Sequence, residues 1–175
     1  MIKLKDLLLE STAPDIFIPR RMEDRLERMI KNYIRDGSQG DLNLRSMNLT
    51  VLPDILKNVS VSGHFFCSGN KLVDLKNSPK YVGDSFHCND NELTSLIGAP
   101  SNVSGHFYCY DNKLTSLDGA PKTVGGNFSC NSNDLTSLEG APKSVGGHFH
   151  CFDNTVQFTE KQVRSLCDVK GRIYV

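Results

Sequence analysis

The 175-residue sequence lacks both a net charge and a long hydrophobic run. Lysine and arginine total 20, and aspartate and glutamate total 20. No segment is basic enough to indicate a nucleic-acid partner by charge alone. The longest apolar run near the start, Leu7 to Leu9, is far shorter than the ~18 residues of a membrane span and lacks the apolar region of a secretory signal. We therefore expect one cytoplasmic structural unit without a membrane or nucleic-acid partner.

Motifs of catalysis and metal binding are also missing. The sequence has no C-x-x-C pair, no glycine-rich phosphate loop before a helix and no recognisable pair of nucleophile and base. We expect neither enzyme activity nor a cofactor. One alternative is a metal site that uses His148, His150 and Asp153, because the two histidines share one face of a strand.

An internal repeat occupies most of the chain. Cysteine recurs every 21 residues, and four other residue types keep the same interval. The columns are Cys67, Cys88, Cys109, Cys130 and Cys151; Phe65, Phe86, Phe107, Phe128 and Phe149; Asn70, Asn91, Asn112, Asn133 and Asn154; Leu75, Leu96, Leu117 and Leu138; and Pro79, Pro100, Pro121 and Pro142. A period of this length predicts a solenoid, in which each coil buries its apolar face against its neighbours.

Each coil has the order F-x-C-x-x-N-x-L-T-S-L-x-G-A-P-x-x-V-G-G-x. Phenylalanine and cysteine two residues apart predict a short strand with both side chains in the core. The Asn, Gly and Pro positions predict bends, and no helix fits within a coil. We expect the thiols to be unpaired apolar fillers, because side chains on neighbouring parallel strands fit disulfide geometry poorly. Unpaired thiols also indicate a reducing compartment, and the asparagines are expected to bond the backbone of adjacent coils.

The pattern L-T-S-L-x-G-A-P-x-x-V…F-x-C-x-x-N resembles the short bacterial leucine-rich repeat of type III-secreted effectors and many phage proteins. The resemblance covers roughly residues 41–158, where Leu42 and Leu44 begin a degenerate first coil. Gly-Ala replaces Pro-x-Leu, Phe replaces one Leu, and each unit is one residue longer than in the family. The resemblance implies a curved stack with a parallel sheet on its concave side, and a binding role without catalysis. Effector ligases carry a large domain after such repeats, and only residues 159–175 follow here, so we expect no ligase activity.

The flanking segments are expected to be caps. Apolar residues at helical spacing predict a helix within residues 19–37, with Pro19 in its first turn and Gly37 at its stop. Thr159 and Gln162 form a capping-box pattern before a short helix, and the final RIYV is expected to add an edge strand. The expected fold is thus an α+β leucine-rich-repeat solenoid. Its parts are a targeting and linker segment (1–18), a helical N-terminal cap (19–40), the solenoid (41–158) and a C-terminal cap (159–175).

A binding face is predicted from the variable positions around each Phe-Cys pair. The candidate partner-binding residues are His64, Phe66, His87, Asn89, His106, Tyr108, Tyr110, His148, His150 and Phe152. A merely solvated face would be rich in Lys, Glu and Asp, whereas uncharged aromatic residues on a rigid sheet are typical of a protein-binding surface. The alternative is that aromatic residues occur here only because they form strands well. If the histidines contact the partner, affinity should vary between about pH 5.5 and 7.5.

The first residues resemble the capsid-targeting sequence of internal proteins in large contractile-tailed phages. In that family a protease cuts after a Leu-x-Glu or Ile-x-Glu site before a small residue, and residues 8–11 are Leu-Leu-Glu-Ser. The alternative is a short amphipathic helix that docks or stays flexible. We expect a phage accessory protein that binds a bacterial host or defence protein in the host cytoplasm. The second hypothesis is an internal protein packaged in the virion.

Overall fold

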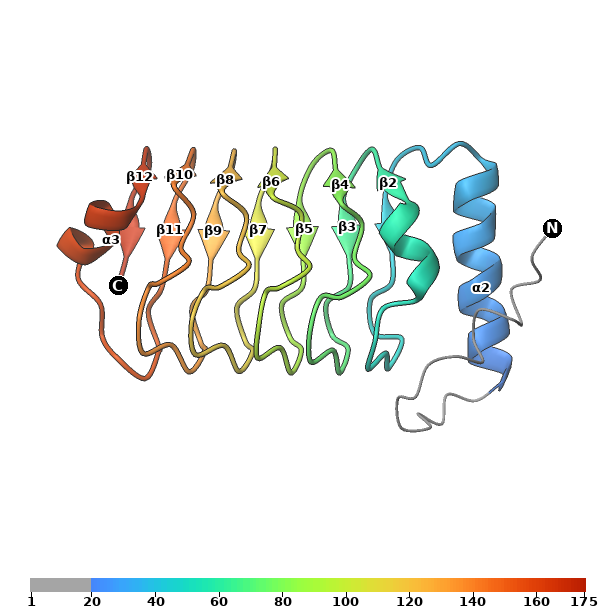
Figure 1. Cartoon of the computed structure of the whole chain (residues 1–175), viewed down its shortest axis with the longest axis horizontal. Helices are drawn as coiled ribbons and strands as arrows, with labels where there is room; N and C mark the ends of the chain where they lie inside the picture. Colours follow the sequence, from blue (N-terminus) through green and yellow to red (C-terminus); the bar gives the residue numbers. More distant parts are fainter. Residues whose placement is uncertain (1–19) are drawn as a thin grey trace.

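The computed structural model describes residues 20–175, with side chains from Arg25 onward. The expected targeting segment, including residues 8–11 and Pro19, lies outside the described residues. In the view of Figure 1 the coils follow one another in a nearly straight row.

Parallel strands of two residues line one side of every coil (Figure 1). They form a seven-stranded sheet of β1 (Leu42–Asn43), β3 (Phe65–Phe66), β5 (Phe86–His87), β7 (Phe107–Tyr108), β9 (Phe128–Ser129), β11 (Phe149–His150) and β13 (Ile173–Tyr174). Neighbouring strands pair in repeat register, so that Phe86 lies opposite Phe107. The predicted solenoid with a parallel sheet is confirmed.

A second set of short parallel strands lies on another side of the coils. It consists of a four-stranded sheet with β12 (Asp168–Val169), β10 (Ser144–Val145), β8 (Thr123–Val124) and β6 (Asn102–Val103), and a two-stranded sheet with β2 (Ser60–Val61) and β4 (Tyr81–Val82). The stack has about six coils of about 21 residues. The end coils deviate from the repeat, because Leu42 pairs with Phe65 after 23 residues and Phe149 pairs with Ile173 after 24.

The core is a continuous stack of like side chains. The five repeat phenylalanines are fully buried, and consecutive rings lie 5.1 to 5.7 Å apart between centroids. The leucine columns pack into the same cluster. Placing identical rings one above another gives each coil the same apolar partner on both sides, which is why the fold depends on stacking.

The cysteine column is buried beside these rings, and all six cysteines are free thiols, as predicted. The Cys88 thiol donates to the backbone oxygen of Tyr108 in the next coil at 3.3 Å, and Cys109 does the same to Ser129. Burial raises the pKa of the repeat thiols, to about 11 for Cys151. Protonated, enclosed thiols are poor nucleophiles, so this column is structural.

The asparagine column satisfies backbone groups at the inner corner of each coil. The Asn112 amide donates to the carbonyl oxygens of Cys88, Cys109 and Tyr110, each at 3.1 Å. Its side-chain oxygen accepts from the Leu93 N–H at 2.9 Å. Equivalent bonds occur in the neighbouring coils, so the predicted role of the asparagines is confirmed.

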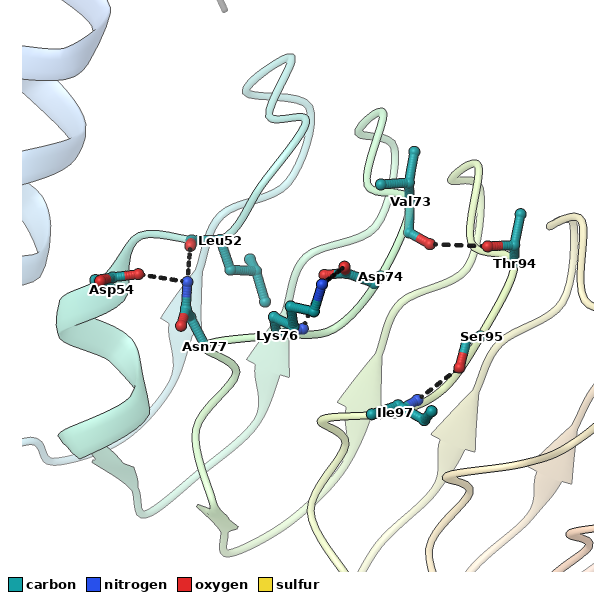
Figure 2. Close-up of polar contacts among 9 residues, drawn as sticks. All are labelled: Leu52, Asp54, Val73, Asp74, Lys76, Asn77, Thr94, Ser95 and Ile97. Atoms are coloured by element: carbon teal, nitrogen blue, oxygen red, sulfur yellow. Dashed lines mark hydrogen bonds and ion pairs between the residues drawn. The ribbon is translucent and has the colours of Figure 1, made fainter. Parts of the chain in front are cut away.

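Side-chain caps also stabilise the turns on the far side of the coils (Figure 2). The Ser95 hydroxyl accepts from the Ile97 N–H at 3.1 Å, and Asp74 in the preceding coil accepts from the Lys76 N–H at 3.0 Å. The serine of the L-T-S-L motif therefore closes a local turn before the glycine.

Helices occur at the two ends of the stack and once in the first coil. The predicted first helix is α2 (Arg20–Arg35), whose Leu26 and Ile30 join the core, and Gly37 follows it at φ +81°. The short 3-10 helix η1 (Asp54–Asn58) was not predicted and lies in the degenerate first coil.

The helix at the other end is α3 (Glu160–Leu166). Both bonds of the predicted capping box between Thr159 and Gln162 are present, and Val163 is buried. The predicted edge strand is β13, which pairs with β11. Within residues 20–175, neither α-helix is long and apolar enough to cross a membrane.

Candidate functional site: the aromatic face of the seven-stranded sheet

The outward side of the seven-stranded sheet holds the side chains predicted to bind a partner. We call this surface the aromatic face and define it by the residues before, between and after each Phe-Cys pair. They are His64, Phe66, Ser68, Ser85, His87, Asn89, His106, Tyr108, Tyr110, Asn127, Ser129, Asn131, His148, His150 and Phe152. Phe152 is 37 % exposed, and most other predicted residues are half-buried because their rings pack on each other. Asn89 is only 7 % exposed and donates to Asp90, so it offers little surface to a partner.

The exposed rings form two clusters. In the first cluster, the Phe66 and His87 rings lie 4.6 Å apart, and the His87 and Tyr108 rings lie 5.0 Å apart. His64, His106 and Tyr110 extend this cluster at 5.4 to 6.1 Å. The first cluster thus spans three consecutive coils.

The second cluster lies at the C-terminal end of the sheet and contains His148, His150, Phe152 and Tyr174. The His150 ring stacks on Tyr174 with centroids 4.5 Å apart, and His148 and Phe152 lie 6.2 and 6.3 Å from His150. One coil with Asn127, Ser129 and Asn131 on its outer face separates the two clusters. The aromatic face therefore presents two apolar patches with a small polar interval.

Two residues of this face were missed in the sequence. Tyr174 belongs to the second cluster, and its position follows from the pairing of Ile173 with Phe149. The 24-residue interval between those two residues hid the final coil from a search at 21. Arg45 in the first coil places its guanidinium carbon 3.7 Å from the centroid of the Phe66 ring.

The histidine column before each phenylalanine has a structural function. The His106 Nδ1 atom accepts from the Asn127 N–H at 2.8 Å, and Asn127 Oδ1 accepts from the His148 N–H at 2.8 Å. His64 and His148 accept in the same way from the next coil. These bonds require the imidazole proton on Nε2, so only that atom and the ring plane are available to a partner.

Burial and neighbouring charge change the titration of the histidines between the Phe and Cys positions. Burial, together with the charges of Arg45, His64 and His106, lowers the pKa of His87 to about 4. Burial, followed by His148, also lowers the pKa of His150. The expectation that histidines on this face titrate between pH 5.5 and 7.5 is therefore wrong for His87, which is neutral throughout that range.

The depressed pKa of His87 predicts acid sensitivity of the fold. The ordinary histidine pKa is ~6.5, so between that value and about 4 the unfolded chain binds more protons than the folded chain. The resulting stability is fully present above ~pH 6.5 and is lost as the pH falls toward 4. Because the ring is half-buried, we expect a loss of about 1–2 kcal/mol in the free energy of unfolding.

Urea unfolding at neutral pH and at mildly acidic pH measures this loss. The control is His87→Ser, because Ser129 occupies the same position in another coil. The variant should lose less stability on acidification than the wild type. Equal losses in the two proteins would exclude His87 as the titrating group.

Metal-binding geometry was tested over the part of the chain that the structure describes. Among those residues, no group of three or more His, Cys, Asp or Glu side chains could hold a metal ion. His148 Nδ1 is already an acceptor for the Arg172 N–H at 2.9 Å.

An open apolar groove lies away from the aromatic face. It is lined by the Gly-Ala-Pro turns of three coils and by Leu166 of α3. Lys122, Lys143 and Glu139 supply the charged side chains of its lining. Nothing in the structure shows what covers it.

Comparison of the sequence with protein-family models and with curated proteins gives no match in either case. Function is therefore inferred from the aromatic face, whose rings are fixed by a rigid stack. The arrangement offers ring faces, imidazole Nε2 atoms and tyrosine hydroxyls to a partner, which suits binding.

Proposed function

We propose that this chain is a non-catalytic protein–protein interaction module that holds a partner protein on its aromatic face. The two ring clusters, which extend over five coils of one regular sheet, are the observation that supports this proposal. Half-buried rings in a rigid arrangement lose little conformational entropy on binding, so they are favourable anchors. No cofactor or metal is required.

The fold belongs, in this proposal, with the short bacterial leucine-rich repeats, and its two end helices act as caps. Leu26 and Ile30 of α2 and Val163 of α3 are buried in the common core, which favours a capping role. Solenoids need such end units because the outer face of a terminal coil is apolar.

The proposed setting is a phage infection, in which the protein binds a bacterial host or defence protein in the host cytoplasm. The support is the resemblance of the repeats and of residues 1–11 to phage sequences. The alternative is an internal virion protein held by that N-terminal segment. Mass spectrometry of purified particles distinguishes them, because a packaged protein would begin at Ser11 and an accessory protein would be absent from particles.

Replacement of two tyrosines tests the aromatic face. Tyr108→Ser with Tyr110→Asn reproduces the side chains of Ser129 and Asn131 in the following coil, so the variant should fold. We expect capture of the partner from bacterial lysate to fall by about tenfold or more, because buried aromatic anchors dominate binding energy. Quantitative mass spectrometry of the captured proteins measures the change.

The control removes similar side chains from other surfaces. Tyr81 and Ile97 are 58 % and 60 % exposed and lie outside the aromatic face. Tyr81→Ser with Ile97→Asn should leave capture unchanged. Undiminished capture by the Tyr108 and Tyr110 variant would rule out this face as the binding surface.

A further inference from the structure

We propose that the segment held on the aromatic face is cationic: an extended stretch of a partner protein whose arginine or lysine side chains lie on the rings between aspartates. This inference rests on the proposed function and names the chemistry of the partner. It depends on the charge of the face, on an arginine of the chain itself, and on the spacing of the rings.

The aromatic face and its two margins are acidic in an otherwise neutral protein. In each of the five repeats, seven residues from the position before the face to the turn after it form this surface (63–69, 84–90, 105–111, 126–132 and 147–153). These segments contain four aspartates, Asp84, Asp90, Asp111 and Asp153, and no lysine or arginine. Because the whole chain has a net charge of 0, the remaining residues have a net charge of +4. The face therefore complements a positive partner.

An arginine from the first coil already occupies one part of this face. Arg45 lies over Phe66 at 3.7 Å and its Nε donates to the Ser68 hydroxyl at 3.2 Å. A guanidinium over an aromatic ring is an attractive electrostatic contact that strengthens as water is excluded. Arg45 thus shows, within the molecule, how a cationic side chain fits these rings.

The rings beyond Arg45 combine the same chemistry with carboxylates. Tyr110 is half-buried, follows Tyr108 at 6.1 Å, and is close enough to Asp90 and Asp111 for both charges to raise the pKa of its hydroxyl. Phe152 in the second cluster precedes Asp153 directly. Asp84 is already paired with His64 Nε2 at 3.6 Å. Asp90, Asp111 and Asp153 all have positive φ and lie at the turn that ends the face.

The distance between the two rings favours a particular spacing in the partner. Tyr110 and Phe152 are two coils apart, which corresponds to about 9.6 Å along the stack. In an extended polyproline-type segment, every third residue lies about 9 Å further along and points the same way. We therefore expect basic residues three positions apart.

A synthetic peptide of sequence Gly-Arg-Pro-Pro-Arg-Pro-Pro-Arg-Gly with a fluorescent label is a suitable probe. Its control contains citrulline, which is neutral and has nearly the same shape as arginine. Binding to the full chain is measured by fluorescence anisotropy at low ionic strength. We expect the arginine peptide to bind about tenfold or more tightly than the citrulline peptide.

Three variants test the residues. Asp90→Asn with Asp111→Asn removes two charges at positive-φ positions that asparagine tolerates, and should weaken binding about fivefold or more. Asp118→Asn with Glu139→Gln makes the same charge change on the far side and should change binding less than about twofold. Arg45→Gln removes the internal guanidinium from Phe66 and should strengthen binding several-fold.

Equal affinity for the two peptides, absence of binding by the arginine peptide, or equal losses in the two charge variants would overturn the cationic proposal. The capture experiment is independent of it. If capture is lost in the Tyr108 and Tyr110 variant but the peptides are not distinguished, the face binds a protein by other chemistry. If capture is undiminished, the proposed function itself is wrong.

Discussion

Replacing Asn112 by alanine should lower the free energy of unfolding by about 4 kcal/mol. The side chain makes four hydrogen bonds to backbone groups in three coils. Alanine leaves these groups without a partner in a largely buried corner, and each such group costs about 1–3 kcal/mol. Because each coil contacts only its neighbours, damage at the centre of the stack weakens the coupling between its two halves. Urea unfolding followed by circular dichroism measures the change.

Asn131→Ala is the matched control. This asparagine lies on the aromatic face and its amide donates to the Ser132 hydroxyl at 3.3 Å. Its replacement should cost less than about 1 kcal/mol. Similar losses in the two variants would show that the buried corner has no special importance.

The regular part of the fold was predictable because the sequence repeats its own physical solution. Phe107, Cys109 and Asn112 occupy positions whose burial and bonding recur every 21 residues, so five examples support each inference. The capping box at Thr159 was also predictable, since its bonds are local.

The irregular ends could not be predicted in the same way. η1 replaces an extended turn in a coil that shares few residues with the repeat, and Tyr174 arrives after a longer interval. The pairing of Arg45 with Phe66 depends on register between coils of different sequence. Such contacts are tertiary, and periodicity contains no information about them.

The candidate face was predicted as a set of positions, but the division of labour among them required coordinates. His64, His106 and His148 use Nδ1 to hold the next coil. Their imidazoles therefore stabilise the sheet and present only one nitrogen outward. The neighbouring column, with Tyr108 and His150, is where rings contact rings across coils.

Replacing Gly119 by alanine is expected to destabilise the fold by about 4 kcal/mol, through a backbone clash that relaxation cannot remove cheaply. A Cβ atom at this position would lie 2.5 Å from the Leu96 carbonyl carbon and equally close to the Ile97 backbone. Gly98 and Gly140 approach the preceding coil in the same manner, which explains the glycine in each Gly-Ala-Pro turn.

The control for Gly119→Ala is Gly40→Ala, which separates steric contact from backbone conformation. Gly119 and Gly40 have φ values of +88° and +74°, so alanine at either position has the cost of a left-handed conformation, about 1 kcal/mol. A Cβ at Gly40 meets nothing within 4 Å, so that variant should lose only this amount. The difference between the two losses in urea unfolding isolates the close approach of adjacent coils. If Gly119→Ala were no more damaging than Gly40→Ala, the coils would have to move apart without cost, which the continuous stack of buried rings and hydrogen bonds opposes.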